Sequence, residues 1–175
     1  MIKKDIINAS ILLIIYFILT CLITLINSSL STIGVYFYLP GLFFLSATLF
    51  FNTTKSFIIC LVTGLFLDTA LETPFGFHTI ILPLFQVIGN KWLKYSGNKN
   101  IYRHAFFQFL SNILISILLL LSIIIFYDKI QISTSKFSLD VILSALIFLP
   151  VCLWFQSLLT NIFFEYSKSK KKLIF

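Results

Sequence analysis

The stretch Gly64-Leu65-Phe66-Leu67-Asp68, followed closely by Pro74-Phe75-Gly76-Phe77-His78, decides how this chain is interpreted. Its first half places a carboxylate inside an apolar run, and its second half is a Pro-x-Gly-x-His turn that leads into the next apolar run. A carboxylate at the centre of a membrane helix costs about 2.5–3.5 kcal/mol on insertion scales, and less near an interface. Asp68 therefore needs a hydrogen-bonding partner, a wet cavity or a functional role.

The composition around this stretch is that of a polytopic membrane protein. Hydrophobic residues make up 59% of the 175 residues and charged residues 11%, and the charges lie almost entirely between apolar runs. A soluble domain of this length needs more polar surface to cover itself. We therefore expect one membrane domain over residues 1–175.

Six apolar runs are each close to the roughly 20 residues that cross a hydrocarbon core of about 30 Å. They predict an all-α membrane protein with spans over residues 6–26, 35–51, 56–71, 75–93, 105–127 and 139–164. A re-entrant hairpin is the alternative to two spans around the turn at 72–74. A cleaved signal peptide is the alternative for the first run, although that run is long for one and Asn27-Ser28-Ser29 is a weak cleavage site.

The basic residues predict the orientation of these spans. If both termini are cytoplasmic, only Lys129 and Lys136 lie outside, and this asymmetry is the positive-inside pattern. The net charge of +7 is then a topology signal and does not indicate nucleic-acid binding. The basic tail at 168–172 is expected to contact anionic lipid headgroups. The residues predicted inside are Lys3, Lys4, Lys55, Lys91, Lys94, Lys99, Arg103, Lys168, Lys170, Lys171 and Lys172.

Polar residues follow one face of several predicted spans. The fifth span carries His104, Gln108, Asn112 and Ser116 at four-residue spacing. Such faces turn toward other helices because lipid cannot satisfy polar groups. We expect interhelical hydrogen bonds there, and a polar substrate cavity is the alternative.

Three prolines, Pro40, Pro83 and Pro150, lie inside predicted spans. Each lacks an N–H and frees the carbonyl one turn earlier, so each is predicted to kink its helix. Discontinuous helices also build transporter sites, but kinked packing helices are far more common.

Gly64, Asp68 and Glu72 share one helix face because they are four residues apart. Asp68 lies about three residues, or some 5 Å, inside the outer end of the third predicted span. The nearest hydrogen-bond donors along the chain are at the start of the fourth span. We expect Asp68 to pin this helix hairpin, with proton or ion coupling as the alternative.

The start of the fourth span supplies specific candidates for that contact. Thr73 is expected to cap the helix, with Pro74 in its first turn. Gly76 is expected to leave room for close backbone approach. Free N–H groups and the helix dipole there would stabilise the Asp68 carboxylate, together with His78.

No catalytic or metal-binding pattern is apparent. There is no usefully spaced Ser/His/Asp set, no phosphate-binding glycine loop and no ligand cluster, so we expect no enzyme activity, cofactor or metal. Cys21, Cys60 and Cys152 all fall within apolar runs and lack CxxC or histidine neighbours. We expect them to be small buried apolar side chains.

The central motif resembles that of the MreD family of bacterial rod shape-determining membrane proteins, and the likeness in size, span number and topology covers essentially the whole chain. Further marks are Pro40 in the second span, and Pro150 with Trp154 in the sixth. Two departures are Asn52-Thr53-Thr54-Lys55, where family members often have a proline, and Glu72, in a turn that is commonly small and polar. We expect structural or partner-binding roles for Pro40, Gly64, Asp68, Pro74, Gly76, His78 and Pro150.

The resemblance implies a non-enzymatic scaffold of the cell-elongation machinery, which makes peptidoglycan at the bacterial cytoplasmic (inner) membrane. The implied partner is an MreC-like single-span coiled-coil protein, with actin-like MreB, the RodA glycosyltransferase and a penicillin-binding transpeptidase beyond it. The family also resembles the six-helix substrate-binding components of energy-coupling-factor transporters. A vitamin-binding transport subunit is therefore the alternative function. Short external loops, and an isolated Ala9 in place of an Ala-x-x-x-Ala pattern, favour the scaffold.

Overall fold

The computed structural model describes residues 2–74, 76–96, 101–126 and 133–171. These residues form six α-helices and a short 3-10 helix, and they contain no β-strand. The expectation of an all-helical chain is therefore confirmed for this part of the protein. In chain order the elements are α1 (Ile2–Leu30), η1 (Ser31–Ile33), α2 (Gly41–Phe50), α3 (Thr53–Ala70), α4 (Phe77–Ser96), α5 (Ile101–Phe126) and α6 (Thr134–Lys171).

Among the described residues, four helical stretches are long and apolar enough to cross a membrane: Ile6–Ile33, Thr53–Ala70, Tyr102–Ile125 and Ser135–Phe163. Helix α2 has 10 residues and is therefore only about 15 Å long, too short to span a bilayer by itself. Large apolar side chains are exposed along α1, α5 and α6, as expected for surfaces that face lipid rather than water.

The second predicted span, 35–51, is helical only in its second half. Residues 35–39 form no helix, and α2 begins after Pro40, which takes the N-cap position with φ −64° and ψ −22°. The prediction that Pro40 kinks a continuous helix is wrong. Its missing N–H falls at a helix start, where an N–H has no intrahelical acceptor. Pro83 and Pro150 do lie inside α4 and α6, as expected.

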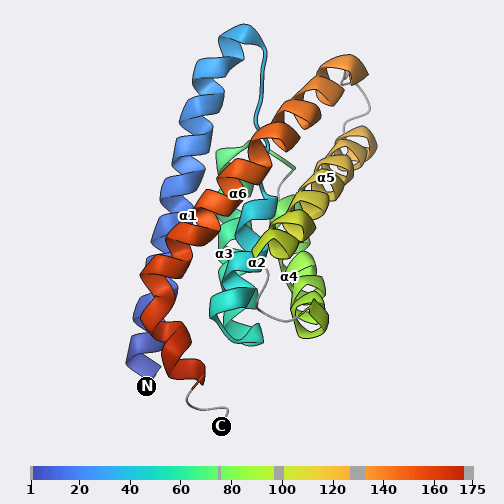
Figure 1. Cartoon of the computed structure of the whole chain (residues 1–175). Coiled ribbons are helices and arrows are strands. Elements are labelled where there is room, and N and C mark those ends of the chain that lie inside the picture. Colours follow the sequence, from blue (N-terminus) through green and yellow to red (C-terminus); the bar gives the residue numbers. More distant parts are fainter. Residues whose placement is uncertain (1, 75, 97–100, 127–132, 172–175) are drawn as a thin grey trace.

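The short helix α2 is the centre of the bundle. Its residues Gly41–Thr48 are all buried, which suits a helix that is apolar on every side. Helices α3 and α4 form one hairpin, α5 and α6 form another, and α2 packs against all four (Figure 1). Helix α1 packs along α3, and the chain returns from η1 into α2 as a nearly straight non-helical trace.

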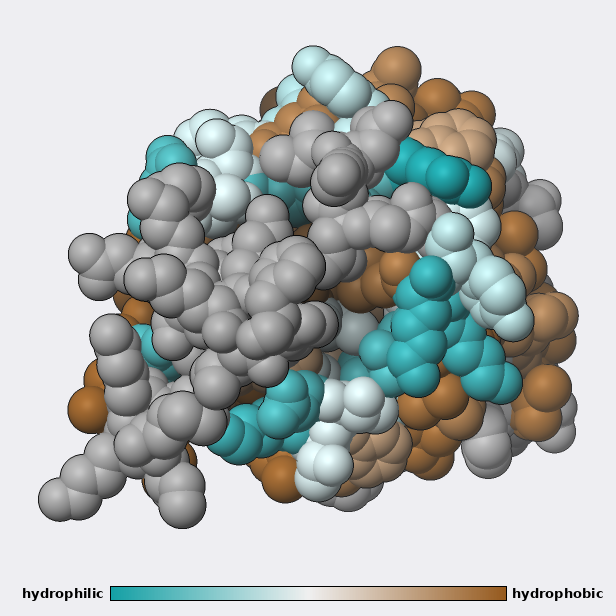
Figure 2. Space-filling model, turned by 60° about the horizontal axis from the view of Figure 1, so that its bottom comes forward, coloured by the Kyte–Doolittle hydropathy of each residue, from teal (hydrophilic) through white to brown (hydrophobic). Residues whose placement is uncertain are grey.

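One end of the bundle carries both termini and many polar residues (Figures 1 and 2). Lys55 lies in the first turn of α3, and Lys91 and Lys94 lie in the last two turns of α4. The Arg103 guanidinium lies 5.3 Å from the centre of the Trp92 ring, which joins the start of α5 to the same end. Basic residues that the sequence predicts on one side of the membrane thus share one end of the molecule.

The three cysteines are free thiols. Cys60 and Cys152 are buried, as expected, but Cys21 is exposed. The prediction was wrong for Cys21 because an apolar run predicts burial in lipid or protein alike, and this side chain lies on a face of α1 that no other described helix covers.

Candidate functional site

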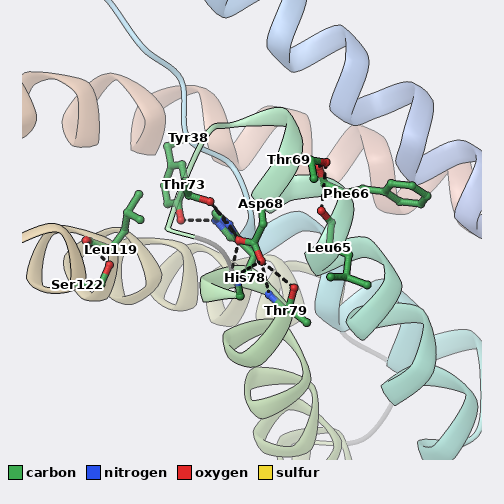
Figure 3. Close-up of polar contacts among 11 residues, drawn as sticks. Tyr38, Leu65, Phe66, Asp68, Thr69, Thr73, His78, Thr79, Leu119 and Ser122 are labelled. Carbon is green, nitrogen blue, oxygen red and sulfur yellow. Dashed lines mark hydrogen bonds and ion pairs between the residues drawn. The ribbon is translucent and has the colours of Figure 1, made fainter. Parts of the chain in front are cut away.

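The Asp68 carboxylate is the centre of a buried hydrogen-bond network between α3 and α4 (Figure 3). Its Oδ1 accepts from the His78 N–H at 2.8 Å, from His78 Nδ1 at 2.9 Å and from the Thr73 hydroxyl at 3.1 Å. Its Oδ2 accepts from the Gly76 N–H at 3.1 Å, the Thr79 N–H at 3.1 Å and the Thr79 hydroxyl at 2.7 Å. Six donors therefore fill the acceptor positions of the carboxylate.

Three of these donors are backbone N–H groups at the start of α4, where a helix has no internal acceptors and its dipole favours an anion. The predicted contact of Asp68 with this helix start is confirmed. The prediction that Thr73 caps α4 is wrong, because the helix begins only at Phe77 and the Thr73 hydroxyl turns to Asp68 and the His78 ring. Pro74 also lies before the helix, and its carbonyl accepts from the Phe77 N–H at 3.0 Å.

Among the described glycines, Gly64 marks the closest approach between the backbones of α3 and α4. A Cβ at Gly64 would lie 2.6 Å from the His78 carbonyl oxygen and 2.6 Å from both Cα and N of Thr79. Glycine here lets the helices come close enough for Asp68, one turn later, to reach the α4 start. The sequence placed this close approach at Gly76, which was wrong. A Cβ there would meet nothing within 4 Å, and φ of +90° is what favours glycine.

His78 connects Asp68 to the non-helical segment before α2. Its Nδ1 donates to the carboxylate, and its Nε2 lies 2.6 Å from the Tyr38 hydroxyl. Because a carboxylate only accepts, Nδ1 carries a proton, and Nε2 shares its hydrogen bond with the Tyr38 hydroxyl. The resulting Asp–His–Tyr chain joins three separate parts of the fold. Sequence reasoning missed Tyr38 because 40 residues separate it from His78.

Side chains of α5 and α6 satisfy the backbone where the non-helical segment enters α2. The Asn112 amide donates to the Tyr38 carbonyl at 3.0 Å, and its oxygen accepts from the Gly41 N–H at 2.9 Å. The Ser144 hydroxyl accepts from the Tyr38 N–H at 3.0 Å. Asn112 of α5 therefore caps the start of α2, which confirms a bond between two helices at this position, and it also binds the non-helical segment.

The upper part of the same segment is held by α1 and α6. The Asn27 side chain both accepts from the Phe37 N–H and donates to its carbonyl, each at 2.8 Å. Asp140 accepts from the Tyr36 N–H at 3.0 Å. Buried backbone groups outside a helix need such partners, so these side chains permit the segment to run through the bundle.

The remaining polar stripe of α5 faces α2 and α6. Gln108 donates to the Leu42 carbonyl at 3.3 Å, and its oxygen accepts from the Cys152 thiol at 2.9 Å and from the Gln156 amide. The prediction of interhelical hydrogen bonds is confirmed here. His104 is buried on the same stripe, and neither of its ring nitrogens has a hydrogen-bond partner.

A cavity of about 460 Å³ lies beside the Asp68 network, between the α3–α4 connection, the non-helical segment, α5 and α6. Tyr38 and Thr73 belong to both the network and the cavity lining. Figure 1 shows the α3–α4 connection at the ends of α3 and α4 that point away from the termini, and the cavity lies beside this connection.

These features define a class of protein: an apolar helical bundle with a broken second segment and a buried carboxylate bonded to a helix start. The chain matches no protein-family model, no curated protein and no solved structure.

Proposed function

We propose that this protein is a non-enzymatic scaffold of the MreD kind in the bacterial cytoplasmic membrane, where it binds an MreC-like single-span partner. The Asp68 network is the observation that supports this most. Gly64, Asp68, Gly76 and His78, which carry much of the resemblance, gather at the α3–α4 connection, where six donors hold the carboxylate. A carboxylate whose acceptor positions are all filled suits a structural pin better than a group that exchanges protons.

The proposed topology has six crossings with both termini cytoplasmic. The second crossing combines α2, about 15 Å long, with residues 35–40, which span at most about 20 Å when fully extended. Together they are long enough for a hydrocarbon core of about 30 Å. Non-helical backbone is tolerated at membrane depth where protein groups satisfy it, as Asn27 and Asn112 do here.

Cysteine labelling tests this topology. Single cysteines at Lys99, which lies outside the described residues, and at Lys136 are placed in a background that lacks the native cysteines. An impermeant thiol reagent added to intact cells should label position 136 and not position 99. Labelling of position 99 from outside would reverse the proposed orientation.

The scaffold function is tested with the single-span partner from the same organism. Co-purification in detergent should recover the two proteins together, and depletion of this chain from a rod-shaped host should give rounded cells. Actin-like MreB, RodA and a penicillin-binding transpeptidase should be recovered only when the MreC-like partner is present. Unchanged cell shape together with no recovered partner would contradict the proposal.

The cavity beside Tyr38 favours a second candidate, a small-molecule-binding subunit of a membrane transporter. Its volume lies within the range of about 300–1,000 Å³ that is usual for ligand pockets. If the purified chain held a vitamin-like compound at nanomolar affinity and depletion left cell shape intact, this function would replace the scaffold.

A further inference from the structure

The charged side chains that line the cavity all have the same sign. Glu72 and Asp140 line it, and none of the described lining residues is Lys, Arg or His. Lys136 lies one turn before Asp140 on α6 but is not part of the lining. On a helix, a lysine one turn before an acidic residue forms a weaker ion pair than a lysine one turn after it. Lys136 therefore neutralises Asp140 only partly. The cavity should therefore attract cations and repel anions.

The rest of the lining is largely apolar. Leu119 and Ile123 contribute from α5, and Phe137 and Val141 contribute from α6. These four side chains offer a hydrophobic surface at a depth where α5 and α6 run beside each other. A ligand with an apolar body displaces water or lipid from this surface, and that displacement favours its binding.

The wall that carries Tyr38 is held in place before any ligand arrives. Ser144 accepts from the Tyr38 N–H, and Asn112 donates to the Tyr38 carbonyl. The Tyr38 hydroxyl is hydrogen-bonded to the His78 ring. A wall that is already ordered costs little further entropy on binding. Tyr36 and Tyr38 both line the cavity, and aromatic side chains can attract cations.

Glu72 stands at the mouth of the cavity in an unusual backbone conformation. It is exposed and has φ of +50°, a region that residues other than glycine seldom adopt. The turn thus places a carboxylate at the rim where a glycine or asparagine would cost less conformational strain.

We propose that this cavity binds an amphiphilic organic cation, with its apolar body between α5 and α6 and its cationic group beside Glu72 and Asp140. The inference rests on the cavity and not on the scaffold function. Failure of ligand binding would leave the partner experiment unaffected, and failure of the partner experiment would leave ligand binding unaffected.

Two ions of matched size and opposite charge test the proposal. Radiolabelled tetraphenylphosphonium and tetraphenylborate are titrated against the purified full chain in phosphatidylcholine nanodiscs, with empty nanodiscs subtracted. Saturable binding of the cation, with no saturable binding of the anion, is expected. No saturable binding of the cation, or equal binding of both ions, would overturn the proposal.

Variants locate the site within the chain. The double variant Glu72→Gln, Asp140→Asn should bind the cation about tenfold more weakly, as expected when two partly solvated charge contacts are lost. Asparagine at 140 keeps an oxygen for the Tyr36 N–H, so the fold should survive. The matched control Asp5→Asn, at the opposite end of α1, should bind like the native chain.

Two further variants change the cavity without removing its carboxylates. Leu119→Trp should fill the cavity and abolish cation binding, and Lys136→Gln should strengthen binding about twofold because it removes a competing charge. Each variant is used only if its size-exclusion profile matches that of the native chain. Unchanged affinity in both the double variant and Leu119→Trp would place the bound cation elsewhere and overturn the proposal.

Discussion

Substitution of Gly64 by alanine should separate α3 from α4, even though it adds one methyl group. The new Cβ would lie 2.6 Å from three atoms of the α4 backbone, where ordinary contact begins at 3.4 Å. Backbone atoms cannot rotate away as a side chain can, so the two helices must move apart. Asp68 lies one turn further along α3, and its bonds of 2.7–3.1 Å to α4 would lengthen with that movement.

The magnitude follows from three terms. Overpacking costs about 1–3 kcal/mol. Loss of one hydrogen bond to a charged group costs about 1.5–3 kcal/mol. Alanine returns about 0.5–1 kcal/mol because it favours the helix more than glycine does. The expected net loss is about 2–4 kcal/mol, which corresponds to a fall in Tm of about 5–15 °C for a chain of this length.

Gly89 provides the matched control. It is also a glycine inside a helix, but its Cβ would meet side-chain atoms of Leu45 at 3.1 Å and Phe44 at 3.3 Å, and these can adjust. Gly89→Ala should therefore change the free energy of unfolding by less than about 1 kcal/mol. Thermal unfolding of both variants in the same detergent is followed by tryptophan fluorescence. Equal Tm values for the two variants would refute the argument that backbone contact at Gly64 sets the spacing of the hairpin.

Substitutions at three further positions follow from the hydrogen bonds and the turn described above. Asp68→Asn should lower Tm less than Asp68→Leu, because asparagine keeps one of the two accepting oxygens; native Tm in both variants would contradict the role of Asp68 as a pin. Gly76→Leu should lower the free energy of unfolding by about 1–2 kcal/mol, because φ of +90° strains a residue that has a side chain. Gly76→Asn should recover most of that loss in the same assay. An equal loss in both variants would show that crowding at the turn, and not φ, is the cause. Asn112→Leu should leave the Gly41 N–H and the Tyr38 carbonyl without partners, at about 1–3 kcal/mol each. Hydrogen exchange of the Gly41 amide should then accelerate, and native protection there would contradict the capping role.

The sequence determined the features that depend on neighbouring residues. The length and apolarity of the runs predicted helices, because a helix satisfies its own backbone whatever surrounds it. The contact between Asp68 and the start of α4 was also predictable from residues close together in the sequence. An anion inside an apolar run needs donors, and the nearest free N–H groups follow within 11 residues.

Only the tertiary structure shows what stabilises the non-helical half of the second span. Gly34 before residues 35–39 and Pro40 after them disfavour a helix there, but they do not indicate which groups satisfy the backbone of that segment inside the bundle. The segment is non-helical because Asn27, Asn112 and Asp140, which come from three other helices, satisfy its backbone. Partners as much as 106 residues away leave no local pattern.

The roles of the glycines show the same division. The sequence indicated that a glycine in the central motif allows close approach, and the three-dimensional packing assigned that role to Gly64 and left Gly76 with open space around it. Composition and spacing determine which residues share a helix face, since the helical repeat is local. Which backbone lies against that face depends on how the helices pack, and that is decided only when the chain has folded.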